Sequence, residues 1–206
     1  MATDTVKSHL TSIYRKSGTK RRAPLLTYLG KWHPLPASLE PLTGFWLSKF
    51  EFESLAANLD TASRQYRKAS QINLERIDEQ SDDYFTHVGR SLCSAPSSTR
   101  TFEHKLLLRL VDQHVVGIWE NTNTKNVGCL QLIIHNDRQT MQGSHLGNAS
   151  DGVVKSGGWI WRKIVCGENE SSNLDGRLFK SYEELESLIT SSNKPGHLIH
   201  FEELFQ

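Results

Sequence analysis

The sequence predicts a mainly β fold, in which about eight short strands close into one antiparallel up-and-down barrel. Two observations support this prediction. Apolar and polar side chains alternate with a period of two in successive stretches between Gly44 and Val165. Short segments rich in Asn, Asp and Gly, which favour turns, separate these stretches. A meander of this kind is expected to pair its first strand with its last, because closure removes exposed sheet edges.

The 206 residues divide into three regions by the character of the sequence. Residues 1–43 are interpreted as a basic, partly helical arm, residues 44–165 as the barrel, and residues 166–206 as a helix and tail that pack on it. A domain of this size buries enough surface to fold without disulfides. The three cysteines are widely spaced and form no Cys-x-x-Cys pair, so we expect reduced thiols in a cytoplasmic protein.

The N-terminal arm begins with a short amphipathic helix, predicted over Thr5 to Lys16, because its apolar residues share one helical stripe. A basic run from Arg15 to Arg22 follows. Such a run is usually a solvated linker, and the alternative is that it contacts phosphates or an acidic partner. Self-association or binding of a protein partner through residues 1–43 is therefore left as a hypothesis.

The strands are expected in order along the barrel region. In the strand that begins at Gly44, Trp46, Ser48 and Phe50 share one face. In the strand from Phe102 to Leu110, the even positions are apolar except for His104, which predicts one wet face. The remaining strands are predicted at Tyr66 to Glu75, Tyr84 to Leu92, Val115 to Asn121, Val127 to His135, Thr140 to Leu146 and Lys155 to Val165.

A helix is predicted near the C-terminus. Ser181 and Glu184 have the Ser-x-x-Glu spacing of a capping box, which starts a helix that continues to about Thr190. Its apolar residues are expected to dock on the barrel. The residues expected to anchor the helix and tail are Tyr182, Leu185, Leu188, Ile189, Leu198, Phe201, Leu204 and Phe205.

Tryptophans that follow glycines are the strongest local signal in the barrel region. A glycine that enters a strand permits close backbone approach, and the tryptophan beyond it fills a barrel end. We favour this structural interpretation, most strongly for Trp46. The alternative for Trp119, Trp159 and Trp161 is a stacking platform for a base or another planar ligand.

Two of these motifs carry a family resemblance. Gly44-x-Trp46 on the first strand and Trp161-Arg162 on the last resemble the calycin superfamily of lipocalin-like barrels. The resemblance covers about 120 residues, through motifs that are short. It implies that Trp46 and Arg162 form a structural pair at the closed end. The chain is expected to differ from secreted lipocalins, because its first residues do not resemble a signal sequence, its cysteines show no disulfide pattern, and an arm precedes the barrel.

The barrel is also similar in size and expected compartment to sensor domains of bacterial antiphage (CBASS-type) effectors. Those domains bind cyclic nucleotides within a minimal lipocalin-like barrel. The resemblance implies a nucleotide-like ligand and a role in antiviral defence. Those effectors carry membrane helices, whereas no apolar run in this sequence reaches the length that a membrane span requires.

Polar residues on inward faces are the candidate ligand contacts, because a few such groups orient a ligand in an apolar site. A negatively charged ligand would favour the lysine and the histidines. The competing interpretation is that each lone polar residue is a satisfied core group. The candidate ligand-binding residues are Ser48, Lys68, His104, Trp119, His145 and Trp159.

Other functional classes find little support. The net charge is +1, from 24 basic and 23 acidic residues, so no global field favours nucleic acid or an anionic membrane. The nine histidines show no metal-ligand spacing, and no nucleophile motif or phosphate-binding loop is present. We therefore predict no catalytic residues, no metal and no cofactor. Three hypotheses remain: a non-enzymatic sensor or binder of a small, nucleotide-like ligand; an interaction module with a filled barrel; and an enzyme that uses histidines at the barrel mouth.

Overall fold

The computed structural model describes residues 42–55, 66–80, 84–95, 102–148, 154–167, 170–174, 177–190 and 198–205. All of them belong to one compact unit, residues 39–206. The predicted amphipathic helix and basic run lie outside the described residues. No helix in the described part of the chain has the length and apolar character needed to cross a membrane.

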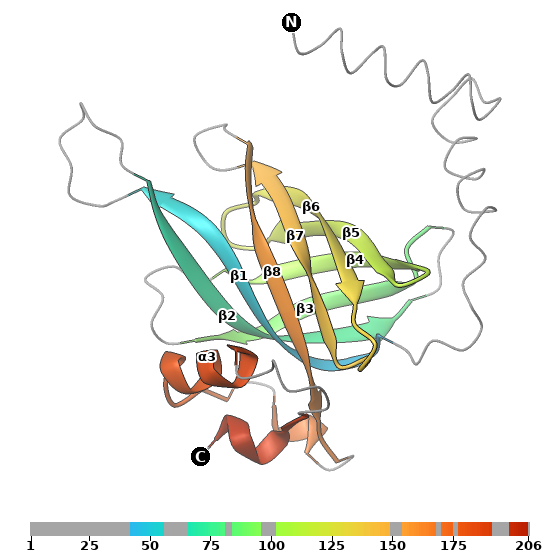
Figure 1. Ribbon diagram of the computed structural model, residues 1–206, viewed down its shortest axis with the longest axis vertical. Helices are drawn as coiled ribbons and strands as arrows, with labels where there is room; N and C mark the ends of the chain where they lie inside the picture. Colours follow the sequence, from blue (N-terminus) through green and yellow to red (C-terminus); the bar gives the residue numbers. More distant parts are fainter. Residues whose placement is uncertain are drawn as a thin grey trace, which may run out of the picture. The chain divides into compact units, whose positions relative to one another are not determined.

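The described strands form one antiparallel meander, as the alternation predicted (Figure 1). Each of the first eight strands pairs with its neighbour in sequence, and β1 also pairs with β8, which closes the barrel. The strands are β1 Gly44–Leu55, β2 Tyr66–Glu79, β3 His87–Ser94, β4 His104–Val111, β5 His114–Asn121, β6 Val127–Ile134, β7 Thr140–Asn148 and β8 Val154–Val165.

The predicted fold class is therefore confirmed as mainly β with a closed eight-stranded up-and-down barrel, which is compatible with a calycin-like fold. The register that closes it runs from Phe45 opposite Ile164 to Phe50 opposite Trp159. Gly44 begins β1 with φ +125°, a conformation that a residue with a side chain rarely adopts.

Two hydrophobic clusters lie on opposite sides of the barrel wall. The inner cluster lies inside the barrel and includes Trp46, Phe50, Trp159 and Trp161. It is completed by Leu42, Ile77, Leu106, Leu108, Leu110, Val115, Leu130, Leu132, Ile134 and Met141. At full burial, side chains of this size each contribute about 1.5–3 kcal/mol, so the inner cluster contributes strongly to fold stability.

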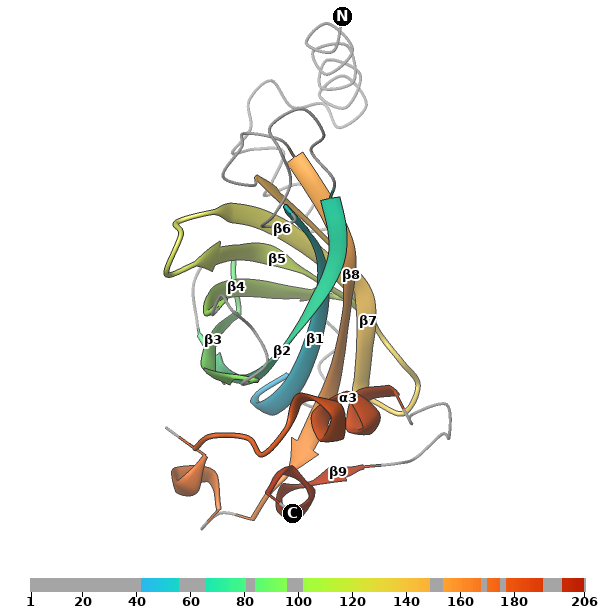
Figure 2. The ribbon, with the colours of Figure 1, turned by 90° about the vertical axis from the view of Figure 1, so that its left-hand side faces the viewer.

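The outer cluster forms because C-terminal elements cover β1 and β2 on the outside. These are the 3-10 turns η1 Ser171–Asn173 and η3 Phe201–Leu204, the helix α3 Tyr182–Thr190, and the short strand β9 Ile199–His200, which runs parallel to β8 (Figure 2). Leu185 and Ile189 of α3 are buried against Leu47, Ile72 and Leu74.

Polar contacts fix the position of α3. The Ser181 hydroxyl accepts a hydrogen bond from the Glu184 amide at 3.2 Å, as the capping motif predicted. Lys49 of β1 bonds Glu186 at 2.7 Å, and the hydroxyls of Ser70 and Tyr182 are hydrogen-bonded to each other. The β1–β2 wall is therefore covered on both faces.

Because β2 is covered on both faces, the prediction of which of its faces points into the barrel is wrong. Lys68 is among the residues predicted to face inward, and Ile72 shares its face of the strand by alternation. In the structure, Ile72 packs under α3 and Lys68 is exposed. The residues on the inner face of β2 are instead Gln71, Asn73 and Glu75, all fully buried. The alternation was correctly identified, but the more apolar face of β2 is the outer one.

Candidate functional site

The barrel interior changes in chemical character along its axis. At the closed end, where the chain enters β1, the filling is aliphatic apart from Trp46 and Trp161, whose rings meet edge to face at 6.3 Å. The Trp46 indole donates to the carbonyl of Leu42 at 2.8 Å. We call the opposite end, where β1 leads to β2 and β7 to β8, the distal end. Toward it the filling becomes aromatic and polar.

The distal half contains a group of rings that we call the aromatic site: Phe50, His104, Trp119, His145 and Trp159. His104 lies 4.9 Å from Phe50, 5.1 Å from Trp159 and 5.9 Å from Trp119, measured between ring centroids. His145 lies 5.6 Å from Trp159. These spacings fall in the range of favourable aromatic contacts.

Glycines make room for the largest of these rings. A Cβ atom at Gly147 would lie 2.2 Å from the Trp119 ring, and one at Gly128 would lie 2.5 Å from it. The Trp119 side chain therefore lies close against the backbones of β6 and β7, where only glycine leaves space.

A buried carboxyl group supports one edge of the aromatic site. Glu75 is fully buried and accepts hydrogen bonds from Ser48 at 3.1 Å and from Ser91 at 2.8 Å. The Nδ1 atom of His104 lies 3.3 Å from the same carboxyl group. If Nδ1 carries the hydrogen that this contact requires, the other ring nitrogen, Nε2, is left for a second partner.

Within the described part of the chain, several buried polar side-chain atoms of the barrel strands have no hydrogen-bond partner. Three are the indole N–H groups of Trp119, Trp159 and Trp161. Two are side-chain carbonyl oxygens, Oε1 of Gln71 and Oδ1 of Asn73. Buried polar groups are almost always paired, so this concentration of unpaired donors and acceptors calls for a physical explanation.

The barrel wall separates beside the aromatic site. β1 and β8 are paired only as far as Phe50 and Trp159, although β1 continues to Leu55 and β8 begins at Val154. A cleft of about 280 Å³ lies at this separation. Its lining residues are Glu51, Phe52, Glu53, Lys68, Ser144, Ser156, Gly157 and Gly158.

His145 lies between this cleft and the interior. Its Nε2 atom is 2.7 Å from the backbone carbonyl oxygen of Glu51, which accepts the hydrogen bond. Burial lowers the pKa of His145 below 6.5 and is the largest influence; the bond to Glu51 raises the pKa and nearby His104 lowers it. The imidazole is therefore neutral near pH 7, with its N–H directed at Glu51.

The structure brings most of the predicted ligand residues together. Trp119, His104, His145 and Trp159 form the aromatic site with Phe50, and Ser48 reaches it through Glu75. Lys68 points away from the interior but lines the cleft. Sequence reasoning missed Glu75, Gln71 and Asn73, because the polar pattern of their face of β2 predicts exposure to solvent.

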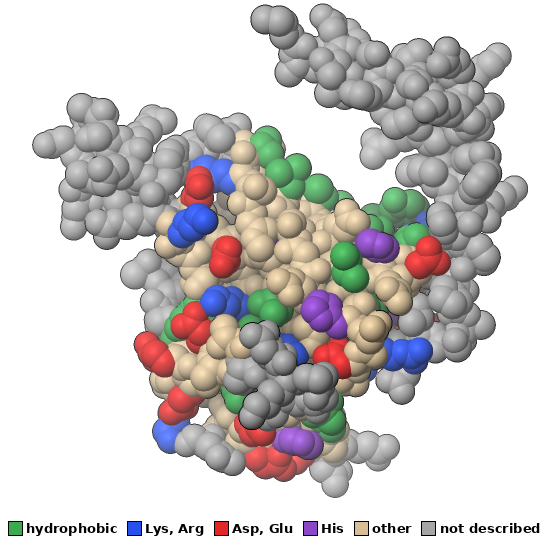
Figure 3. All heavy atoms as spheres, in the orientation of Figure 1, with side chains coloured by type: hydrophobic (Ala, Val, Ile, Leu, Met, Phe, Trp, Pro, Cys, Tyr) green, Lys and Arg blue, Asp and Glu red, His purple; other side chains and the backbone are tan. Residues whose placement is uncertain are grey.

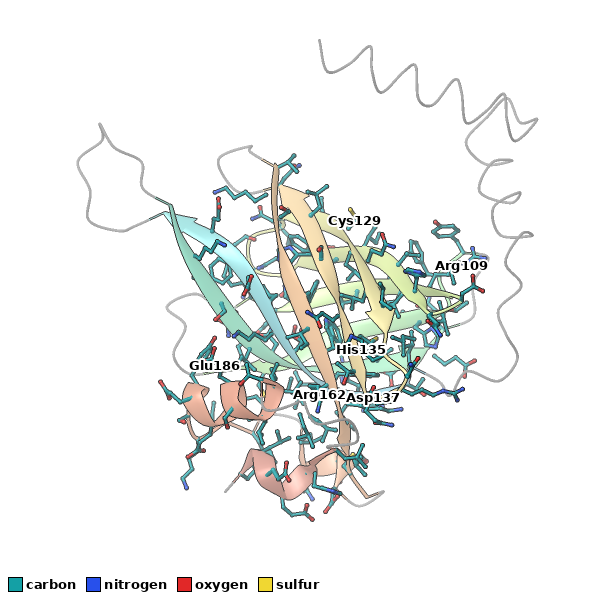
Figure 4. The ribbon with its side chains drawn as sticks, in the orientation of Figure 1. Arg109, Cys129, His135, Asp137, Arg162 and Glu186 are labelled. Atoms are coloured by element: carbon teal, nitrogen blue, oxygen red, sulfur yellow. The ribbon has the colours of Figure 1, made fainter. Side chains whose placement is uncertain are left out.

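At the closed end, the cation recorded over the Trp46 ring is that of Lys163, 5.8 Å from its centroid. Arg162 is buried and donates to the Thr140 hydroxyl at 2.5 Å, with Asp137 3.9 Å away (Figure 4). Burial raises the pKa of Asp137, but hydrogen bonds from Thr140 and the Gln139 amide, together with the charge of Arg162, lower it below its usual value. Lys163 therefore lies over the Trp46 ring, and the structural pairing of Trp46 with Arg162 that the resemblance implies stays a prediction.

A second hollow, of about 840 Å³, is lined by residues of β3 to β8. Its lining includes outward-facing apolar side chains that are 45–57% exposed: Ile118, Val127, Leu146 and Val154. Hydrophobic side chains near the upper end of β8 are visible in Figure 3. Cys129, labelled in Figure 4, belongs to the same lining.

Comparison with family models, curated proteins and solved structures gave no match. Within the described ranges, no three His, Cys, Asp or Glu side chains are grouped so that they could hold a metal ion.

Proposed function

We propose that this protein is a non-enzymatic small-ligand binding or sensor protein, and that its barrel takes up a planar, nucleotide-like ligand at the aromatic site. The unpaired interior atoms carry this proposal. Indole N–H groups and amide oxygens in one interior offer both donors and acceptors to a single ligand. An unpaired buried polar group costs about 1–3 kcal/mol of stability. A ligand that forms hydrogen bonds with several such groups therefore gains a corresponding amount of binding free energy.

The surrounding rings favour a flat ligand. Stacking of a base on an aromatic side chain contributes about 1–3 kcal/mol to binding. It does not discriminate between bases, because every base has a π face. His104, supported by Glu75, provides a hydrogen-bonding edge beside Trp159. A nucleobase combines a π face with donor and acceptor edges, which makes it a suitable ligand for this chemistry.

The charges at the cleft favour a ligand with few phosphates. Glu51 and Glu53 line it together with Lys68, which pairs across the strands with Glu53. A phosphate there would meet more negative than positive charge. We therefore expect a nucleoside to bind at least as tightly as its monophosphate.

The serines of the interior support a binding role over a catalytic one. Both Ser48 and Ser91 donate to Glu75. A serine nucleophile is activated by an adjacent general base, in most enzymes an imidazole. The hydrogen bonds of these serines instead hold the carboxyl group in place beside His104.

Tryptophan fluorescence tests the proposal. Titration with nucleobases, nucleosides and linear and cyclic nucleotides should change the emission, and Trp159→Phe, which removes one unpaired donor, should weaken binding about tenfold. His135→Ala, at an exposed residue of the β6–β7 link, is the matched control and should bind normally. No response to any member of the panel would exclude the proposal.

The second candidate function is a protein-interaction or oligomerisation module. The exposed apolar lining of the 840 Å³ hollow favours it, because apolar surface grouped in this way often marks an interaction site. Light scattering over a range of protein concentrations tests self-association. Ile118→Asp should reduce it, whereas Ile133→Asp, outside the hollow and 47% exposed, should not.

A further inference from the structure

We infer that the cleft between β1 and β8 is the entrance to the aromatic site, and that the hydrogen bond from His145 to Glu51 closes it. This inference rests on the proposed function, since it describes how a ligand would reach that site. Beyond Phe50 and Trp159, the ladder of paired residues that joins β1 to β8 stops.

The side chain of His145 crosses this separation. His145 belongs to β7, which is not adjacent to β1 in the sheet, yet its Nε2 atom reaches the Glu51 carbonyl at 2.7 Å. Gly157 of β8 lies in between. A Cβ atom at Gly157 would be 1.9 Å from the Glu51 oxygen and 2.7 Å from His145 Nε2, so the contact requires glycine at this position.

The two sides of the imidazole contact different environments. One edge meets Glu51 and Gly157, which line the cleft. The ring also makes edge-on contacts with Phe50 at 6.1 Å, Trp119 at 6.0 Å and Trp159 at 5.6 Å. Phe52 lines the cleft as well and packs against the inner cluster. His145 therefore forms the partition between the cleft and the aromatic site.

The partition can open at small energetic cost. Within the described part of the chain, one hydrogen bond spans it, from His145 to the Glu51 backbone, whereas His104 lies against the Glu75 carboxyl group. Rotation of the His145 side chain would connect the 280 Å³ cleft with the rings behind it, without breaking a rung of the β ladder.

Acrylamide quenching of tryptophan fluorescence tests this without any ligand. His145→Phe keeps a ring but removes the donor, and it should raise the quenching constant by up to about fivefold, the factor that one hydrogen bond represents. Gly157→Ala should act in the same direction, because its Cβ displaces the contact. His145→Gln, which retains an N–H donor, should remain close to wild type, as should His135→Ala.

Stopped-flow binding of a responding nucleoside provides the second readout. His145→Phe should accelerate both association and dissociation about fivefold with little change in Kd. Unchanged quenching in both His145→Phe and Gly157→Ala would overturn the entrance, even if a ligand binds. Faster quenching in the absence of any ligand response would leave the entrance standing and reject the proposed function.

Discussion

Gly147→Ala probes how tightly Trp119 is packed in the distal half of the barrel. The new Cβ would lie 2.2 Å from Cζ2 and 2.7 Å from Cη2 of Trp119, well inside van der Waals contact. The ring cannot retreat freely, because Gly128 supports it on the other strand and His104 lies 5.9 Å away. Overpacking of this kind costs about 1–3 kcal/mol, and we expect Gly147→Ala to lower the free energy of unfolding by that amount.

Urea unfolding followed by circular dichroism measures this cost, and two further variants establish its origin. Gly158→Ala is the matched control, because the nearest atom outside its chain neighbours, Oε2 of Glu51, would lie 3.4 Å from the new Cβ, so its effect should stay within about 0.5 kcal/mol. In a Trp119→Leu background, Gly147→Ala should cost about 1 kcal/mol less than in wild type. Equal costs for the two glycines, or no relief in that background, would refute the reasoning.

Two further predictions concern the polar interior. Glu75→Ala leaves the donors of Ser48, Ser91 and His104 without their shared acceptor and should destabilise the fold by about 3–5 kcal/mol, whereas Glu75→Gln, which keeps one acceptor oxygen, should cost less in the same urea assay. Burial lowers the pKa values of His87 and His145 below 6.5, so the unfolded chain binds more protons. The stability that these histidines contribute is thus present above pH 6.5 and declines as the pH falls below it. A double His87→Gln, His145→Gln variant should show a flatter pH dependence of the unfolding free energy. An unchanged slope would contradict this assignment.

Local patterns of apolar and polar residues predicted much of the barrel. The period-two alternation identified every strand from β1 to β8, with boundaries that differ by a few residues, for example β2 continuing to Glu79. It also placed Ser48 and His104 correctly on inner faces, because each stands among large apolar residues that share its face of the strand. Ser181 predicted the start of α3, since a capping hydroxyl acts on amides only three residues away.

The candidate site depended on contacts between distant segments. Leu185 and Ile189 cover the outside of β2, so both faces of that strand are buried and its apolar pattern no longer shows which face points inward. For this reason Glu75 could not be identified as an interior group.

The sequence by itself therefore determined the strands, their meander and the aromatic filling, because these follow from side-chain alternation along the chain. Only the tertiary structure decided that Glu75 supports His104, that three indole N–H groups lack partners, and that His145 of β7 bonds Glu51 of β1. The physical reason is that hydrogen bonding and burial depend on how residues far apart in sequence are brought together. A periodic pattern along the chain does not show which of these residues come into contact.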